Sequence, residues 1–295
     1  YLQSVSPKYE GTNHHLEITY SFQKPSTDTI AVDLENRPLR DEEGRLIFRP
    51  GGHGALLENL NDLKGDIIFI KNIDNVVPDR LKPPTFQYKK VLAGYLIWLQ
   101  RNIYHYLEKL TGEDWEEHLN ELVQFIAENL NQKITVSLER FDRPEERRNY
   151  LFNFLNRPIR VCGMVKNEGE PGGGPFWVEE ANGEESLQIV ESAEVDLHSP
   201  DQLNIWKAST HFNPVDLVCG VRDYQGNPFN LLAFTNPESG IITRKSLNGQ
   251  DIKALELPGL WNGGMAKWIT VFVEVPIITF NPVKTIFDLL RAEHQ

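Results

Sequence analysis

A single stretch near the start of the chain, residues 49 to 77, constrains the fold more than any other. It reads RPGGHGALLENLNDL, a two-residue joint, and then DIIFIKNIDNVV. The first part gives a helix at Ala55–Leu63 by its apolar spacing, and the second gives a strand at Asp66–Ile73 that is apolar on both faces. Strands of that kind are typical of parallel sheets with helices on both faces, so the stretch predicts an α/β fold.

The same stretch carries polar groups where such folds bind ligands. Gly51, Gly52 and Gly54 lack a Cβ atom, so the backbone around His53 can approach a flat or anionic ligand closely, and the following helix start offers unpaired N–H groups. Asp74 ends the buried strand, and open α/β sheets bind ligands at the carboxyl ends of their strands. Together these features predict a site for a nucleotide and a metal ion.

The rest of the chain alternates between strand and helix patterns. We expect further strands at His15–Phe22, Thr29–Asp33, Leu46–Phe48, Ile159–Lys166, Phe176–Glu179, Leu187–Val190, Leu217–Arg222 and Ile269–Val275. We expect further helices at Phe86–Leu110, Asp114–Asn131, Glu145–Leu155 and Pro282–Arg291. The glycine-rich EGEPGGGP at 168–175 reads as a turn between strands. These elements predict one continuous domain, in which residues 1–80 belong to the nucleotide-binding core, 81–156 are a helical insertion, and 157–295 complete a mixed sheet.

Charge and composition narrow the class of protein. The 295 residues carry a net charge of −12, which argues against nucleic-acid and anionic-membrane partners but permits one local basic pocket. The longest apolar run, at 91–99, is too short to span a bilayer. Cys162 and Cys219 lie in apolar strand patterns and are expected to be buried free thiols, which favours a cytoplasmic protein. The oligomeric state is not indicated.

Several short motifs follow one another in an order that resembles a known superfamily. They are Gln23, RPGGHGAL, IDN, CGMV, IVESAEVD, HFNPVD, WNGGMAKW and TFNPVK. Their order is similar to that of the eukaryotic-type UDP-sugar pyrophosphorylases, and nearly the whole chain resembles a bacterial family, domain of unknown function 4301. The resemblance implies a three-layer α/β fold with a mixed sheet of nucleotide-diphospho-sugar transferase type and a helical insertion. It also implies nucleotide and sugar-phosphate partners.

The resemblance also implies a role for each motif residue. In this reading the backbone of Gly51, Gly52, His53 and Gly54 holds the uracil edge, and Gln23 contacts the base or ribose. Glu191 and Glu194 face the sugar hydroxyls. Asp74 ligates a Mg²⁺ ion on the α-phosphate, with Asn213 or Asp216 as a second oxygen ligand, which suits an ion that keeps most of its waters. Lys267, or else Lys284, contacts the phosphates, so that Asp74 and Lys267 are the expected catalytic residues.

Two departures qualify the implied activity, which is Mg²⁺-dependent transfer of a nucleotidyl group from UTP to a sugar 1-phosphate. Met265 stands where alignment on Asn262 and Gly263 would place the phosphate lysine. No glycine-rich phosphate loop with basic residues is present, and the chain begins at Tyr1, so we expect a fragment without the amino-terminal phosphate-loop segment. A non-catalytic nucleotide- or sugar-binding module and a purely structural or interaction protein therefore remain as alternatives.

Simpler readings exist for individual residues. His53 can be an ordinary turn residue, Asp74 and Asn75 can cap a turn, and Glu191 and Glu194 can be solvated carboxylates at a strand end. His14 and His15 do not form a metal pair, because neighbouring strand residues point to opposite faces. The aromatic run at 95–106 has helical spacing and is expected in the core.

Overall fold

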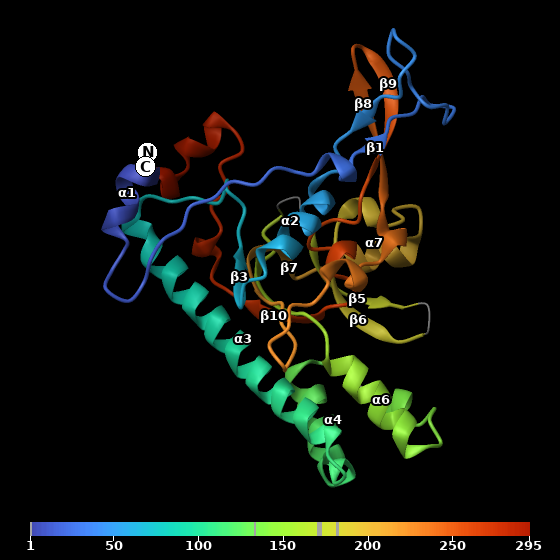
Figure 1. Cartoon of the computed structure of the whole chain (residues 1–295). Coiled ribbons are helices and arrows are strands. Elements are labelled where there is room, and N and C mark those ends of the chain that lie inside the picture. Colours follow the sequence, from blue (N-terminus) through green and yellow to red (C-terminus); the bar gives the residue numbers. More distant parts are fainter. Residues whose placement is uncertain (1, 133, 170–172, 181–182) are drawn as a thin grey trace.

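The structure, a computed structural model, describes residues 2–132, 134–169, 173–180 and 183–295, and it does not describe the side chains of residues 135, 136, 213 and 214. Residues 170–172 of the glycine-rich turn therefore lie outside the described residues. A central sheet occupies the middle of the molecule, a helical lobe extends from one end of it, and a narrow arm of strands projects from the other (Figure 1). The carboxyl terminus lies beside the start of the long helix, where the Arg80 guanidinium donates to the Gln295 carbonyl.

The central sheet has four strands in the order β10 (Ile269–Glu274), β4 (Ile159–Lys166), β7 (His211–Gly220) and β3 (Ile67–Ile70). Strand β10 is parallel to β4, whereas β7 is antiparallel to both β4 and β3. The mixed sheet is confirmed. The expectation that the apolar strand at 66–73 has parallel neighbours was wrong, because β3 is an edge strand among the described residues and its partner β7 is antiparallel.

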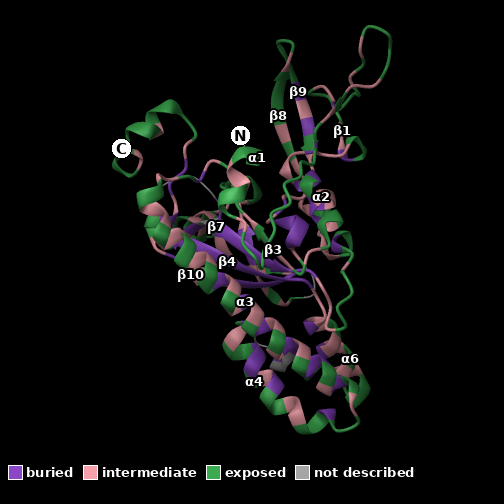
Figure 2. Ribbon diagram, turned by 60° about the vertical axis from the view of Figure 1, so that its left-hand side comes forward, coloured by how far each residue is buried: buried purple, intermediate pink, exposed green. Residues whose placement is uncertain are grey.

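Side chains alternate between two cores on the two faces of this sheet. Val161, Val165 and Val218 point to the face covered by α3, and we call this cluster the α3-side core. Cys162 and Cys219 point to the opposite face, where they pack with residues of α2 and of the 260–268 loop in the α2-side core. Because successive strand residues point to opposite faces, β4 and β7 are buried on both sides, as Figure 2 shows.

A helical lobe is formed by residues 82–155, within the segment expected as an insertion. It contains α3 (Lys82–Thr111), the 3₁₀ turn Trp115–His118, α4 (Leu119–Asn129), α5 (Thr135–Leu138) and α6 (Pro144–Leu155). One stripe of α3 is buried along the whole helix, at Leu92, Leu96, Leu99, Ile103, Tyr106, Leu107 and Leu110. That stripe packs on the sheet near its start and on α4 and α6 near its end. Among the described helices, none is both long and apolar enough to cross a membrane.

A short helix returns the chain from the glycine turn to the sheet. Helix α2 (Leu56–Leu63) ends at Lys64, whose φ of 49° is left-handed, and Gly65 then leads into β3. Leu57 and Leu60 bury one face of α2 against the α2-side core. Helix α2 and strand β3 run in opposite directions. The start of α2 and the end of β3 therefore lie toward the same end of the strands.

Three strand pairs surround this core. Strands β5 (Gly174–Glu179) and β6 (Glu185–Val190) form a hairpin, which is followed by α7 (Pro200–Lys207). The projecting arm consists of β1 (Thr29–Ile30) with β2 (Phe48–Arg49) and of the hairpin β8 (Ile241–Leu247) with β9 (Gln250–Glu256). A backbone bridge between Val32 and Lys253 joins the two pairs.

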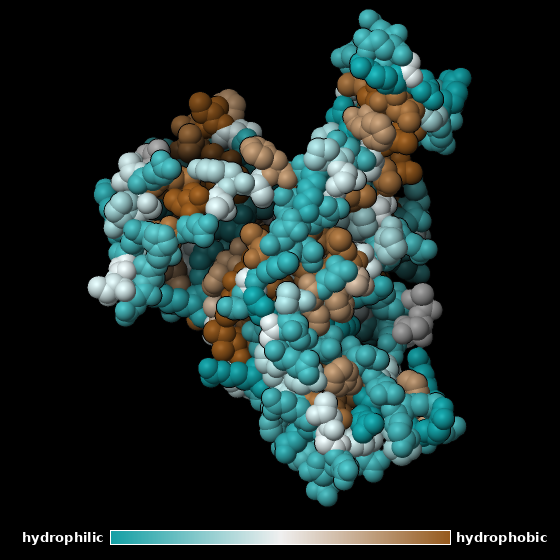
Figure 3. Space-filling model, in the orientation of Figure 1, coloured by the Kyte–Doolittle hydropathy of each residue, from teal (hydrophilic) through white to brown (hydrophobic). Residues whose placement is uncertain are grey.

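Several expected boundaries were wrong, for a common reason. His15–Phe22 forms no strand, because its alternating apolar residues have no sheet to pack on and Phe22 remains 85% exposed. Pro282–Arg291 forms only a 3₁₀ segment at Ile286–Leu290, which adds to an apolar surface in that region (Figure 3). The expected strands at 29–33 and 217–222 are β1, which is shorter, and β7, which begins earlier. A local pattern cannot reveal whether a burying surface exists.

Candidate functional site

The glycine turn packs with its backbone against residues 256–260, which follow β9. The Leu257 N–H donates to the Gly51 carbonyl at 2.8 Å. A Cβ atom on Gly54 would lie only 2.1 Å from the Pro258 carbonyl oxygen, and Gly52 has a φ of 77°. A Cβ atom on Gly51 would in turn lie 2.6 Å from the Thr27 carbonyl oxygen, so all three glycines are required by close approach or by a left-handed backbone.

His53 is fixed in the turn by three neighbours. Its Nδ1 accepts the Leu260 N–H at 3.0 Å, its ring stacks on Trp261 with centroids 4.6 Å apart, and its Nε2 lies 3.8 Å from Glu191 Oε1. Because Nδ1 is an acceptor, the neutral ring carries its proton on Nε2. The proton thus points toward the Glu191 carboxylate.

Glu191 and Glu194 form a capping box at the start of the 3₁₀ turn Ser192–Glu194. One carboxylate oxygen of Glu194 accepts the Glu191 N–H and the side-chain amide of Asn262, both at 2.8 Å. Asn262 is only 4% exposed, and its Oδ1 has no hydrogen-bond partner among the described residues. A buried carbonyl oxygen without a donor costs roughly 1–3 kcal/mol, so this atom is suited to accept a hydrogen bond from a ligand.

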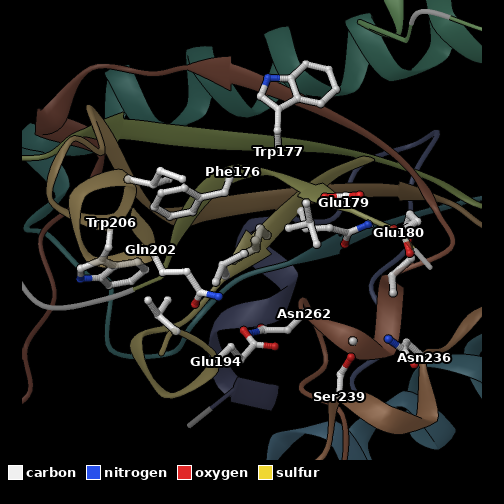
Figure 4. Close-up of a pocket in the computed structure, with 18 residues that line it drawn as sticks. Phe176, Trp177, Glu179, Glu180, Glu194, Gln202, Trp206, Asn236, Ser239 and Asn262 are labelled. Carbon is white, nitrogen blue, oxygen red and sulfur yellow. Dashed lines mark hydrogen bonds between the residues drawn. The ribbon is translucent and has the colours of Figure 1, made fainter. Parts of the chain in front are cut away.

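A cavity of about 460 Å³ opens beside this pair. Its polar wall includes Gln188, Glu194, Asn236 and Asn262, and its apolar wall includes Phe176 and Trp206. Figure 4 shows Glu194 and Asn262 pointing toward one another on one side and the Phe176 and Trp206 rings together on another. These two rings are stacked, with centroids 5.4 Å apart. A cavity with one polar and one aromatic wall suits a ligand that has hydroxyl groups on one face and C–H groups on the other.

The loop that carries Trp261 and Asn262 rests on a buried arginine. Arg160 of β4 is fully buried, its Nε donates to Thr270 Oγ1 at 2.8 Å, and its Nη1 donates to the Trp261 carbonyl at 2.5 Å. The same guanidinium lies 3.5 Å from the sulfur of Met265, which is also fully buried. Burial lowers the pKa of Arg160. Met265 thus belongs to the support of the loop and has no exposed surface.

The segment that follows Gln23 contacts the glycine turn through Thr27. The carbonyl oxygen of Thr27 would be 2.6 Å from a Cβ atom on Gly51, and the side-chain amide of Gln23 donates to Asp28 at 3.3 Å. Lys24 anchors this segment to α2 through ion pairs with Glu58 at 3.5 Å and Asp62 at 2.7 Å. The structure therefore brings Gln23, the glycine turn and His53 to one region.

Asp74 lies at the end of β3 against a segment from the far end of the chain. Its carbonyl accepts the Val283 N–H at 2.9 Å. The neighbouring Asn75 is buried, donates to the Thr279 carbonyl at 3.0 Å and accepts the Asn281 N–H at 2.8 Å. The backbone of Lys284 is therefore close to Asp74 in space, because the neighbouring Val283 bonds to the Asp74 carbonyl.

Lys267 lies near the opposite end of the strands from Asp74. It lies two residues before the start of β10, whose first residue pairs with Ile159, the first residue of β4. Ile159 in turn pairs with Gly220. Gly220 also pairs with Ile67, the first residue of β3. Asp74, in contrast, lies beyond the last residue of β3. The two expected catalytic residues are thus separated by the length of β3, and their joint role stays a prediction.

Asp216 points to the α3 side of the sheet. It is 4% exposed, and its carboxylate forms a hydrogen-bonded ion pair with Lys89 of α3. Burial raises the pKa of Asp216, and the nearby Lys89 and Lys71 ammonium groups oppose this effect.

These contacts do not fit Asp216 as a magnesium ligand, because an ammonium group already holds its carboxylate. Asn213 lies in β7, but its side chain lies outside the described residues. No group of three His, Cys, Asp or Glu residues that could hold a metal ion occurs in the part of the chain that the structure describes. Magnesium stays a prediction that rests on Asp74.

Sequence patterns missed several residues of the site. Trp261 was not singled out, although the WNGG motif marked its position, and no sequence signal indicated that Asn262 would donate to Glu194. Phe176 and Trp206 were missed because they come from a strand and a helix that only the fold brings together. The observed cluster therefore unites the expected Glu191, Glu194 and His53 with residues that no local motif identifies.

Comparisons with known proteins give one family and several solved structures. The family described as domain of unknown function (DUF4301) matches residues 1–295. A mutant UDP-glucose pyrophosphorylase from Leishmania major in complex with UDP-glucose is 14% identical with a TM-score of 0.43, over 89% of this chain and 46% of that one. A UDP-glucose phosphorylase from Trypanosoma brucei is 15% identical with a TM-score of 0.40, over 89% and 45%. The chain spans less than half the length of these two proteins, and no curated protein matches it.

Proposed function

The chain belongs to the DUF4301 family over its whole length, and from that premise we propose that it binds a nucleotide sugar in the manner of a sugar nucleotidyltransferase. The observation that carries the proposal is the Glu194–Asn262 pair at the wall of the cavity, with the buried Asn262 Oδ1 left without a donor. A sugar hydroxyl can donate to this oxygen. The Phe176 and Trp206 rings offer an apolar surface for the C–H face of the same sugar.

The nucleotide would lie against the glycine turn. Backbone N–H and C=O groups of Gly51–Gly54 can pair with the edge of a base, and Gln23 offers an amide that both donates and accepts. His53 stacks on Trp261 and lies 3.8 Å from Glu191, so it would lie between the nucleotide and the sugar. The phosphates would extend toward the end of β3, where Lys71 and Lys284 bring positive charge close to Asp74.

In the reaction that such a site serves, an oxygen of a sugar 1-phosphate forms a bond to the α-phosphorus of UTP, and pyrophosphate leaves with the electrons of the broken P–O bond. Positioning and charge neutralisation carry most of this chemistry, so no side-chain nucleophile is needed. Magnesium would assist as an ion on the phosphates. Asp74 would be its protein ligand, because Asp216 is held by Lys89.

A second candidate is a module that binds a nucleotide sugar without turnover. Met265 favours it, because this residue is fully buried against Arg160 and a lysine there could not reach a phosphate without disrupting the loop support. Pyrophosphate release on mixing UTP with a sugar 1-phosphate would favour the enzyme. Binding of UDP-sugars without any such release would favour the module.

Calorimetric titration with UDP-glucose, UDP-N-acetylglucosamine and UMP tests the binding proposal. We expect saturable binding of at least one UDP-sugar, and Glu194→Gln should weaken it about tenfold while UMP binding is retained, since a hydrogen bond to a charged group contributes roughly 1.5–3 kcal/mol. Glu108→Gln, on an exposed turn of α3, is the matched control and should bind as the wild type does. Absence of binding for every nucleotide and UDP-sugar would overturn the proposal.

A further inference from the structure

A second cavity, of about 350 Å³, lies on the other side of the loop that carries Ala266. Its walls include Phe154, Arg157, Glu180, Glu185, Lys267 and Trp268. It shares only Glu180 and Ala266 with the cavity beside Glu194. Gln188 of β6 stands between the two, where its side-chain amide donates to the Ala266 carbonyl at 2.7 Å. The two cavities are thus neighbours whose linings differ except at Glu180 and Ala266.

Arg157 supplies one positive charge to this cavity. Its Nε donates to the Phe154 carbonyl at 2.6 Å, and its guanidinium lies over the Phe154 ring, 4.6 Å from the centroid. A further N–H of the group lies 3.4 Å from the Lys267 carbonyl. Burial lowers the pKa of Arg157 to about 10, which leaves the group charged at neutral pH. The structure gives it no carboxylate at ion-pair distance among the described residues.

Lys267 and Trp268 add two donors. The Lys267 side chain is exposed, and none of the ion pairs of the described residues involves its ammonium group. Trp268 is 3% exposed, and its indole N–H is buried without a hydrogen-bond partner in the described part of the chain. A buried N–H without an acceptor is costly, so it points to an acceptor that the protein itself does not provide.

The acidic residues of the cavity are mostly occupied. Glu180 accepts the Ser186 hydroxyl, and Glu184 accepts the Ser137 hydroxyl together with the Tyr150 hydroxyl at 3.0 Å. Arg140 lies 3.9 Å from Glu184. Glu185 remains at the rim. Carboxylates in this setting exclude a bare dianion from their side of the cavity but can accept hydroxyl groups of a ligand.

We propose that this second cavity binds a sugar phosphate, with the phosphate held by Arg157, Lys267 and the indole N–H of Trp268 and the sugar hydroxyls directed to the acidic side. The donor set matches a phosphate, because a planar guanidinium and a flexible ammonium together offer several charged N–H groups. The acidic side selects a ligand that also carries hydroxyl groups. The site is separate from the cavity proposed for the nucleotide sugar and does not depend on it.

The Trp268 indole resonance offers a direct readout. Protein labelled with ¹⁵N-tryptophan would be titrated with glucose 6-phosphate, inorganic phosphate and glucose, and the resonance would be assigned by its loss in Trp268→Phe. We expect a saturable shift of this resonance with glucose 6-phosphate and little shift with glucose. Lys267→Met should weaken glucose 6-phosphate binding about tenfold, as expected for a lost charged hydrogen bond, whereas Lys90→Met, at an exposed position on α3, should not.

An unmoved Trp268 resonance at millimolar glucose 6-phosphate would overturn the proposal, as would equal shifts with glucose and with its phosphate. If the Trp268 resonance of Lys267→Met shifts with glucose 6-phosphate at wild-type affinity, Lys267 does not bind the phosphate. Glu194→Gln separates the two sites, because it should leave the Trp268 response to glucose 6-phosphate intact. Retention of that response in a protein that binds no UDP-sugar would support this site and count against the proposed function alone.

Discussion

At the scale of single residues, the candidate site depends on backbone approach more than on side-chain chemistry. The glycine turn touches residues 256–260 through main-chain atoms, and this contact places His53 against Trp261 and next to Glu191. Three segments distant in sequence meet there. The sequence motifs identified each segment, but their contact could not be foreseen, because it depends on a fit between backbones that no residue pattern encodes.

Gly54→Ala should disrupt this contact. The new Cβ atom would lie 2.1 Å from the Pro258 carbonyl oxygen and 2.7 Å from that of Leu257, so the backbone must move. We expect a loss of about 3 kcal/mol in the free energy of unfolding, at the upper end for overpacking, together with loss of UDP-sugar binding. Urea denaturation and calorimetry measure the two effects.

Gly94→Ala is the matched control for this substitution. Gly94 lies inside α3, and a Cβ atom there meets nothing within 4 Å. Alanine should therefore raise the free energy of unfolding by up to about 1 kcal/mol, because it is the better helix former. Equal effects of the two substitutions would contradict the close approach at Gly54.

Residue identities at the site were predictable to different degrees. Glu191, Glu194 and His53 were expected from motif order, and the structure places them together. Asp216 was expected at a metal site and lies instead under α3 with Lys89. Its register on β7 decides the face to which it points, and a shift of one residue would reverse that face. Sequence patterns give the presence of a strand more reliably than its register.

At the scale of elements, the strongly periodic segments were predicted well. Helix α3 and strands β4 and β10 have patterns that are several residues long and burial that agrees with those patterns. Strand β3 is shorter than expected, and its Phe69 is 48% exposed. Elements failed where the pattern was short or where no partner surface was present, as at 15–22. Helix α3 and strand β7 meet through an ion pair, which no apolar periodicity could indicate.

Lys89→Met should loosen the contact between α3 and β7. The substitution leaves the buried Asp216 carboxylate without its cation, and we expect a loss of about 3 kcal/mol in the free energy of unfolding at pH 7. Thermal or urea unfolding measures this loss. Lys90→Met, one residue along the same helix and exposed, should change stability little.

The effect of Lys89→Met should depend on pH. Burial already raises the pKa of Asp216 above its ordinary value of 3.8, so the folded state favours the protonated carboxyl and loses that advantage as pH rises through the raised pKa. Without Lys89 the pKa rises further. The deficit of the variant should therefore be small near pH 4 and grow toward pH 7, and adding Asp216→Asn should flatten this dependence. A deficit that is constant with pH would rule out the ion pair as its source.

At the scale of the whole molecule, the central sheet separates the α3-side core from the α2-side core. The cavity beside Glu194 includes Ile189 of the α2-side core in its lining. The second cavity lies at the helical lobe, because its lining includes Leu130 and Phe154. The face under α3 is filled by apolar side chains and the Lys89–Asp216 pair. Many apolar residues that remain exposed gather at the C-terminal segment and on the arm (Figure 3), whereas Trp177 and Ile205 are exposed beside the cavity at Glu194.

The two thiols should report on opening of the whole molecule. Cys162 and Cys219 are fully buried, and burial raises the pKa of Cys162 to about 11 and raises that of Cys219 as well. We expect neither to react with a disulfide reagent in native buffer at pH 8, and both to react in urea at the concentration where tryptophan fluorescence reports unfolding. Cys162→Ala assigns the two labelling events. Rapid labelling in native buffer would show that the core opens locally.

Helix α3 joins the sheet and the lobe through one unbroken stripe of buried side chains. The length of the helix therefore determines how the lobe is oriented relative to the sheet. Its 30 residues extend over about 45 Å. Its buried side chains pack against the sheet at one end and against α4 and α6 at the other. Inserting one residue near Leu99 would turn everything beyond it by about 100° about the helix axis. The lobe would then lie on a different side of the molecule. The number of residues in α3 therefore determines the orientation of the lobe.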